Sequence, residues 1–217
     1  GQEKAPGALR EAGLVRLLRD RGLEVSDYGD REIWRWRPDR ERPFAQNLGR
    51  VVEFVDDTAA RVVESILARE ITVVLGGDCT ITLGALDGFG GGGLVYFDGD
   101  ADLTTPERSA SAVADTMGMT HMLGGGSPRL ARLGSRYPLL RPGQVVLFGF
   151  DPAELDTGEW TELVSRHLYA APAPAVPSGI ALTSPIVPAT RSRTRTRPPL
   201  FKTTYRPSGV AEVRRLP

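Results

Sequence analysis

Three carboxylates follow one apolar run of the chain at alternating positions. Residues 94–97, Leu-Val-Tyr-Phe, lead directly into Asp98, Asp100 and Asp102. Carboxylates this close raise one another's pKa strongly, so they cannot all stay ionised in a partly buried strand end without a counter-charge. A bound divalent cation is the usual counter-charge, and an oxygen-rich site suits Mn²⁺ or Mg²⁺. A solvated acidic loop is the alternative for an Asp-x-Asp-x-Asp pattern taken alone.

A second apolar run, residues 71–75, ends in a Gly-Gly-Asp turn at residues 76–78 and then Cys79. Ligands of parallel sheets bind just beyond the carboxyl ends of the strands. A turn of this kind after a neighbouring strand therefore favours the metal interpretation over the solvated loop. Cys79 is either a metal ligand or a small buried residue at the start of a helix. As a ligand, its soft thiolate favours Zn²⁺ over Mn²⁺.

The elements that must position these residues alternate between helix and strand. Apolar residues recur at spacings of three and four between Pro43 and Ile66, which predicts one long amphipathic helix. Nearly continuous apolar runs are typical of strands that are covered on both faces. Strands are predicted at residues 23–28, 71–75, 94–97 and 145–148, and further helices at 6–18, 80–86 and 151–167. This alternation predicts an α/β fold with a mainly parallel sheet and helices on both faces.

The chain of 217 residues carries 27 basic and 27 acidic side chains, but they are unevenly distributed. Residues 1–170 hold 19 basic and 26 acidic residues, whereas residues 171–217 hold 8 basic residues against Glu212 alone, together with 9 of the 17 prolines. No stretch approaches roughly 18 uncharged apolar residues and no secretory signal is visible, so no membrane association is expected. The single Cys79 suits a reducing compartment, and we expect a cytoplasmic protein.

Several motifs of residues 1–168 resemble those of the ureohydrolase superfamily, the arginase, agmatinase and formiminoglutamase group. They are Pro-x-Ala-Leu-Arg at residues 6–10, the Gly-Gly-Asp turn, the aspartates with Thr-Pro-Glu after them, and a Ser-rich loop that reaches Gly118-Met119. The resemblance implies a three-layer α/β/α domain, arginase-like and here incomplete, with two Mn²⁺ ions at the strand ends. It also implies a homo-oligomer that breaks a C–N bond of a small guanidino-type substrate by means of a metal-held hydroxide.

The resemblance assigns the candidate ligands one by one. Asp98 matches the family's bridging carboxylate, and Asp102 matches a ligand of the first metal. Cys79 and Asp100 stand where the family has metal-binding histidines, so both are candidate ligands of altered chemistry. The expected metal ligands are therefore Asp98, Asp102, Asp100 and Cys79. The resemblance implies Mn²⁺ as the metal, and Zn²⁺ is the alternative.

Two further departures concern catalysis. Met117 stands where the family has a histidine that helps proton transfer. His121, four residues later, either reaches the site or is a partly buried structural histidine, and we expect the second. The family's later Asp-x-Asp pair has no counterpart, because no Asp follows Asp156 in this chain. We therefore expect little or no hydrolase activity.

The tail, residues 169–217, does not continue the family pattern. A Pro-rich segment at residues 170–177 and an Arg/Thr run at 191–199 have no periodicity that buries a face, so the tail is expected to be disordered. One explanation is a basic arm that binds nucleic acid or another polyanion. The other is a shift of reading frame near residue 170. Apart from such an arm, no nucleic-acid partner is expected.

Overall fold

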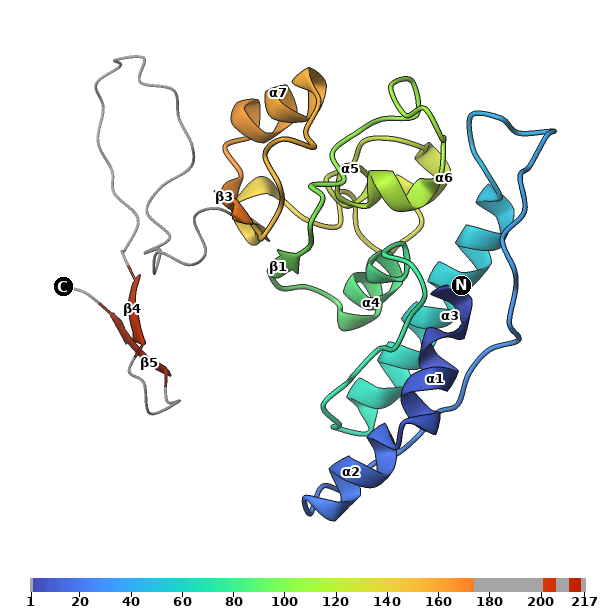
Figure 1. Ribbon diagram of the computed structural model, residues 1–217, viewed down its shortest axis with the longest axis vertical. Helices are drawn as coiled ribbons and strands as arrows, with labels where there is room; N and C mark the ends of the chain where they lie inside the picture. Colours follow the sequence, from blue (N-terminus) through green and yellow to red (C-terminus); the bar gives the residue numbers. More distant parts are fainter. Residues whose placement is uncertain (1, 174–200, 206–210, 216–217) are drawn as a thin grey trace. The chain divides into compact units, whose positions relative to one another are not determined.

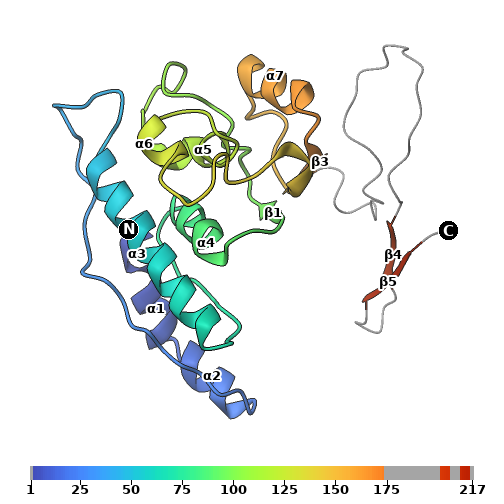
Figure 2. The same ribbon diagram turned by 180° about the vertical axis from the view of Figure 1, so that it is seen from behind.

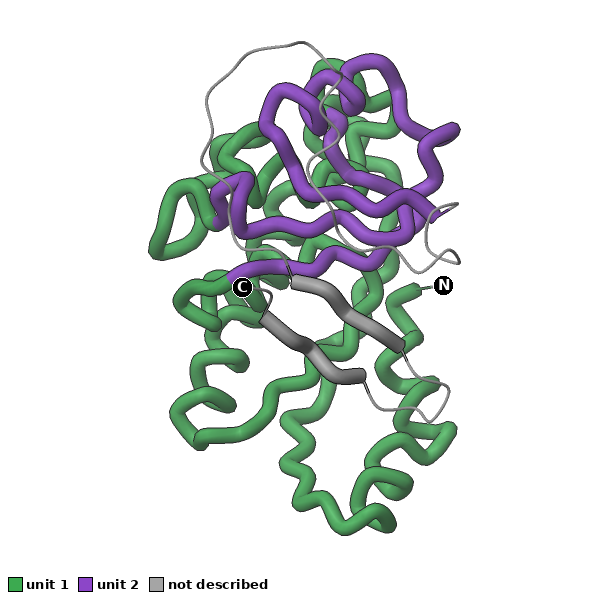
Figure 3. Tube along the Cα trace, turned by 90° about the vertical axis from the view of Figure 1, so that its left-hand side faces the viewer, with its two compact units in different colours: residues 1–92, 105–139 green, residues 93–104, 140–217 purple. Residues whose placement is uncertain are grey.

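A computed structural model of the chain describes residues 2–173, 201–205 and 211–215 (Figure 1). The chain divides into two compact units, which Figure 3 distinguishes by colour. Unit 1 comprises residues 1–92 and 105–139, and unit 2 comprises residues 93–104 and 140–217. No helix within the described ranges has both the length and the apolar character needed to cross a membrane.

Unit 1 is helical. Its elements are η1 (Gln2–Lys4), α1 (Ala5–Glu11), α2 (Leu14–Asp20), α3 (Leu48–Leu67), α4 (Ile81–Phe89), η2 (Ala114–Met117), α5 (Gly118–Met122) and α6 (Pro128–Ala131). The predicted long helix is confirmed as α3, although it begins at Leu48 rather than at Pro43. The buried side chains of Val55 and Val62 recur at helical spacing along it, as the apolar pattern requires.

Helices α3 and α4 lie side by side in unit 1, as both views show (Figures 1 and 2). Two glycines of α4, Gly84 and Gly88, are one helical turn apart and face the backbone of α3. A Cβ atom placed at Gly84 would lie 2.2 Å from the carbonyl oxygen of Val55, and one at Gly88 would lie 2.5 Å from that of Ala59. The absence of these side chains therefore lets the two helix backbones approach closely.

Unit 2 contains the sheet. Its elements are β1 (Leu94–Phe97), η3 (Pro142–Gln144), β2 (Val145–Phe148), α7 (Thr157–Ser165), β3 (Tyr169–Ala171), β4 (Phe201–Tyr205) and β5 (Ala211–Arg215). Strands β1, β2 and β3 form a parallel sheet in that order. The predicted strands at residues 94–97 and 145–148 are thus confirmed, and so is the α/β class with a parallel sheet. Helix α7 lies beside β3 in both views (Figures 1 and 2).

The β1–β2 pair has two different faces. Tyr96, Val145 and Leu147 are buried on one side, where the parallel register places Tyr96 beside Leu147. On the other side Phe97 stacks on Phe148, with ring centroids 5.2 Å apart. Because residues alternate between the faces of a strand, Leu94 and Tyr96 both point to the covered side, and Tyr96 is the buried one.

Two predicted strands are wrong. Residues 23–28 and 71–75 form no strand, and Ile71 in the second run is 96 % exposed. A strand exists only through its hydrogen-bond ladder with a neighbour, and neither run forms such a ladder with any described residue. The second run is instead tied to α3 by the side chains of Thr72 and Ser65, whose hydroxyl oxygens lie 2.8 Å apart.

Most of the predicted tail, residues 174–200, 206–210 and 216–217, lies outside the described residues, and with it the proposed basic run at 191–199. Strand β3 begins at Tyr169, directly after residue 168, where the tail was expected to begin. Strands β4 and β5 form an antiparallel pair that the sequence did not predict.

Candidate metal centre

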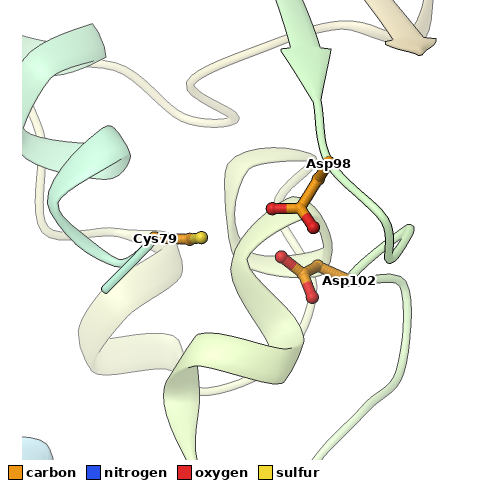
Figure 4. Close-up of side chains that lie close together, drawn as sticks. All are labelled: Cys79, Asp98 and Asp102. Carbon is orange, nitrogen blue, oxygen red and sulfur yellow. The ribbon is translucent and has the colours of Figure 1, made fainter. Parts of the chain in front are cut away.

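The carboxylates of Asp98 and Asp102 come together directly after β1, in unit 2. A ligand oxygen of each lies within 4.8 Å of one on the other. Figure 4 shows the two carboxylates facing each other, from the end of the strand and from the loop that follows it. Asp98 is half-buried and Asp102 is only 7 % exposed. Two carboxylates in this arrangement repel each other unless a proton or a cation separates them.

The loop between the two aspartates is anchored by its backbone at several points. The N–H of Asp98 donates to the Phe148 carbonyl at 3.1 Å, which extends the β1–β2 ladder by one bond. The N–H of Asp151 donates to the Gly99 carbonyl at 2.8 Å. The N–H of Leu103 donates to Oε1 of Glu159 at 3.2 Å, in the first turn of α7. These bonds fix the loop on the two strands and the helix of unit 2.

Asp102 itself has a backbone conformation that few non-glycine residues adopt. Its φ angle is +50°, in the left-handed region. That region costs an L-residue with a Cβ atom roughly 1–2 kcal/mol, although Asp tolerates it better than most. This left-handed residue belongs to the loop after β1 in which the Asp102 carboxylate comes to face that of Asp98 (Figure 4).

Tyr96 supplies a hydrogen bond that the sequence did not predict. Its hydroxyl donates to Oδ2 of Asp102, and both side chains are buried. A carboxylate that accepts a hydrogen bond is stabilised in its ionised form. The available signal was a single polar atom in an otherwise apolar strand, because a buried tyrosine hydroxyl usually requires a partner.

The other two predicted ligands are Asp100 and Cys79. Asp100 is exposed, and its backbone N–H donates to Oδ1 of Asp98 at 3.0 Å. Cys79, also drawn in Figure 4, is half-buried just before α4 in unit 1. Its N–H donates to Oδ1 of Asp115 at 2.7 Å. The N–H of Thr80 donates to Oδ1 of Asp78 at 2.9 Å, so the predicted Gly-Gly-Asp turn leads into a helix.

His121 lies in α5 and is almost completely buried, more deeply than expected. Its Nε2 accepts a hydrogen bond from the N–H of Ser127 at 3.1 Å. Burial lowers the pKa of His121 to about 4, because the charged ring loses its hydration. The smaller effect of the Met117 backbone raises this pKa. The imidazole is therefore neutral at physiological pH.

The Asp98–Asp102 pair fits a small divalent cation. Two oxygens bound to one such ion at about 2.1 Å each lie at most about 4.2 Å apart. The ligand oxygens of the pair lie within 4.8 Å, so small side-chain adjustments let both reach one ion. The donor set of two carboxylates is the kind that Mn²⁺ and Mg²⁺ prefer.

Comparisons with known proteins identify the family to which this chain is similar. The model of the arginase family matches residues 1–167. The arginase of Bacillus caldovelox is 32 % identical over 165 residues, which cover 73 % of this chain and 54 % of that protein. The arginase of Bacillus subtilis strain 168 is 32 % identical over 163 residues, with the same coverage.

Solved structures agree as well. The crystal structure of Bacillus subtilis arginase matches with a TM-score of 0.73 at 30 % identity, over 81 % of this chain and 60 % of that one. The native structure of Bacillus caldovelox arginase matches with a TM-score of 0.74 at 28 % identity. The chain belongs to the arginase family, as the motifs predicted, and has the arginase α/β fold. It spans about half the length of the curated relatives it matches.

Proposed function

We propose that this chain binds one divalent cation, Mn²⁺ in the first place, through Asp98 and Asp102. The observation that supports the proposal is the facing carboxylate pair, one member of which is buried and hydrogen-bonded to Tyr96. Each carboxylate contributes one negative charge, and together they offset the charge of a divalent ion. The loop anchors hold both side chains in place before the ion arrives, which lowers the entropic cost of binding.

Cys79 and Asp100 belong to the same proposal as further ligands. Their sequence positions match family histidines that bind metal. A thiolate from Cys79 would move the preference from Mn²⁺ towards Zn²⁺. The exposed carboxylate of Asp100 would approach from the solvent side. A comparison of the two metals in Cys79→Ser and Asp100→Asn variants therefore tests each of these assignments separately.

The proposed reaction class is hydrolysis of a C–N bond in a small guanidino-type compound. The arginase relatives support this class by name. A divalent ion in such a site supplies an activated water and stabilises the charge that develops on the substrate. The residues of this chain hold the ion and exclude part of the solvent, since Ala101, Asp102 and Leu103 are buried. A cytoplasmic homo-oligomer is part of the same proposal.

We expect slow turnover from this 217-residue chain. No Asp follows Asp156, so the described carboxylate pair has no second pair further along the sequence to complete a two-metal site. Urea release from arginine or agmatine with Mn²⁺ supplied should stay below about 1 per second, an ordinary enzyme rate. Turnover at or above that rate would contradict this part of the proposal.

Metal binding is tested by isothermal titration calorimetry of the full chain with Mn²⁺. We expect one ion per chain, with binding at least tenfold weaker in the Asp98→Asn and Asp102→Asn variants. Asp56→Asn is the matched control, because this aspartate lies exposed on α3 and its loss should leave the affinity unchanged. Equal affinity in the wild type and both site variants would overturn the proposal.

A further inference from the structure

We infer that Tyr96 is a positioning residue of the metal centre, whose hydroxyl orients the Asp102 carboxylate towards the cation. The inference rests on the proposed function, since orientation matters only if the pair binds an ion. It concerns the buried hydrogen bond from the Tyr96 hydroxyl to Oδ2 of Asp102. The ion itself would be held by the two aspartates, and Tyr96 would act through Asp102 alone.

The geometry favours orientation because the contact is buried at both ends. Tyr96 and Asp102 are each 7 % exposed. Rotation of the Asp102 carboxylate would therefore break a hydrogen bond that water cannot replace, and a buried polar group without a partner is costly. Figure 4 shows the Asp102 carboxylate facing that of Asp98, and the bond from Tyr96 to Oδ2 favours this orientation over others.

The same contact is not needed to hold the backbone of the loop. The carbonyl of Gly99 is already bound by the N–H of Asp151, and the N–H of Leu103 by Glu159. These two bonds lie on either side of Asp102 and connect the loop to the rest of unit 2. The Tyr96 hydroxyl therefore acts on the orientation of the Asp102 side chain rather than on the path of the loop backbone.

The sheet packing does not require the hydroxyl either. Tyr96 points to the covered face of the β1–β2 pair, beside Leu147, where a phenylalanine ring would fill the same volume. The hydroxyl is also the only polar side-chain atom in Leu94–Phe97. A tyrosine at this position thus adds one hydrogen-bond donor to an apolar strand, and this donor binds the proposed ligand Asp102.

The direct test is the Tyr96→Phe variant of the full chain, titrated with Mn²⁺ and followed by the electron paramagnetic resonance signal of the free ion. We expect binding to weaken by about 10- to 100-fold, the usual effect of losing a partner that orients a metal ligand. Tyr28→Phe is the matched control, because Tyr28 also donates to a carboxylate, Oε2 of Glu70 at 2.8 Å, at an exposed site. A Tyr96→Phe affinity within twofold of the wild type would overturn the inference.

The Asp102→Asn variant separates this inference from the proposed function. If Asp102→Asn binds Mn²⁺ as well as the wild type, the proposed metal centre itself fails. If Asp102→Asn weakens binding and Tyr96→Phe does not, only the positioning role fails. In the Asp102→Asn background, the Tyr96→Phe change should cause no further loss of affinity, because the hydroxyl acts only through that carboxylate.

A second double variant, Tyr96→Phe/Asp102→Ala, covers the case in which Tyr96→Phe alone does not fold. Removal of both members of a buried polar pair costs far less than removal of one, and alanine, unlike asparagine, leaves no polar side-chain atom at this buried position. Recovery of folding in this double variant would support the coupling between the two residues. A double variant that fails to fold, although Asp102→Ala alone folds, would show that the hydroxyl is needed for the sheet and would overturn the inference.

Discussion

A single methyl group added to α4 should destabilise the contact between the two longest helices of unit 1. The change is Gly84→Ala. In most helices this substitution is favourable by about 1 kcal/mol, because alanine is the better helix former. Here the new Cβ atom would lie 2.2 Å from the carbonyl oxygen of Val55 and 2.9 Å from Cβ of Thr58. Ordinary contacts begin at 3.4 Å, so the helices must separate by about an ångström.

The size of the effect follows from the two opposing contributions. Overpacking against a neighbour costs typically about 1–3 kcal/mol, and the value should lie at the upper end because the obstacle is a rigid carbonyl group. After about 1 kcal/mol of helix propensity is subtracted, the expected net loss of unfolding free energy is about 2 kcal/mol. That loss corresponds to a fall of roughly 4–8 °C in Tm for a protein of this size.

The assay is urea unfolding followed by circular dichroism at 222 nm, supported by thermal melting. Gly7→Ala in α1 is the matched control, because a Cβ atom there meets nothing within 4 Å. This control should raise stability by about 0.5–1 kcal/mol. If Gly84→Ala raised stability as much as Gly7→Ala, the close approach of α3 and α4 would be refuted.

Three further predictions concern other parts of the chain. His121 has a folded-state pKa of about 4, below its usual 6.5, so the unfolded state binds more protons between these values. Stability should thus fall by about 3 kcal/mol as the pH drops from 7 to 4, and urea unfolding should show a smaller fall in His121→Gln. Asp156 caps α7 by accepting from the N–H of Glu159 at 2.7 Å, so Asp156→Ala should cost about 1 kcal/mol in urea unfolding. If Cys79 ligates the ion, Cys79→Ser should weaken Zn²⁺ binding at least tenfold in calorimetry and leave Mn²⁺ binding nearly unchanged.

Helix α3 and strands β1 and β2 could be predicted because their signals are local. The apolar spacing along α3 and the runs of β1 and β2 identify these elements from their own residues. Residues 71–75 have the same composition as a buried strand, yet they form none. Whether an apolar run becomes a strand depends on the neighbour that completes its ladder, and no local pattern contains that information.

The candidate site could be predicted in part for the same reason. The spacing of Asp98 and Asp102 after an apolar run indicated a carboxylate pair, and the structure brings the two together. The lone hydroxyl of Tyr96 indicated that it needs a partner, but the sequence could not identify that partner as Asp102, because the contact depends on the path of the loop between them. The hydrogen bond from the Leu103 N–H to Glu159 could not be predicted either, since 56 residues separate the two in sequence. The metal roles of Cys79 and Asp100 stay predictions.

The metal centre is tested most directly by a crystal structure of the full chain grown with Mn²⁺, with diffraction recorded at the manganese absorption edge. We predict an anomalous peak at bonding distance from the carboxylate oxygens of Asp98 and Asp102, with Oδ2 of Asp102 still bound to the Tyr96 hydroxyl. A map without a peak beside this pair, at a Mn²⁺ concentration that saturates binding in solution, would contradict the account.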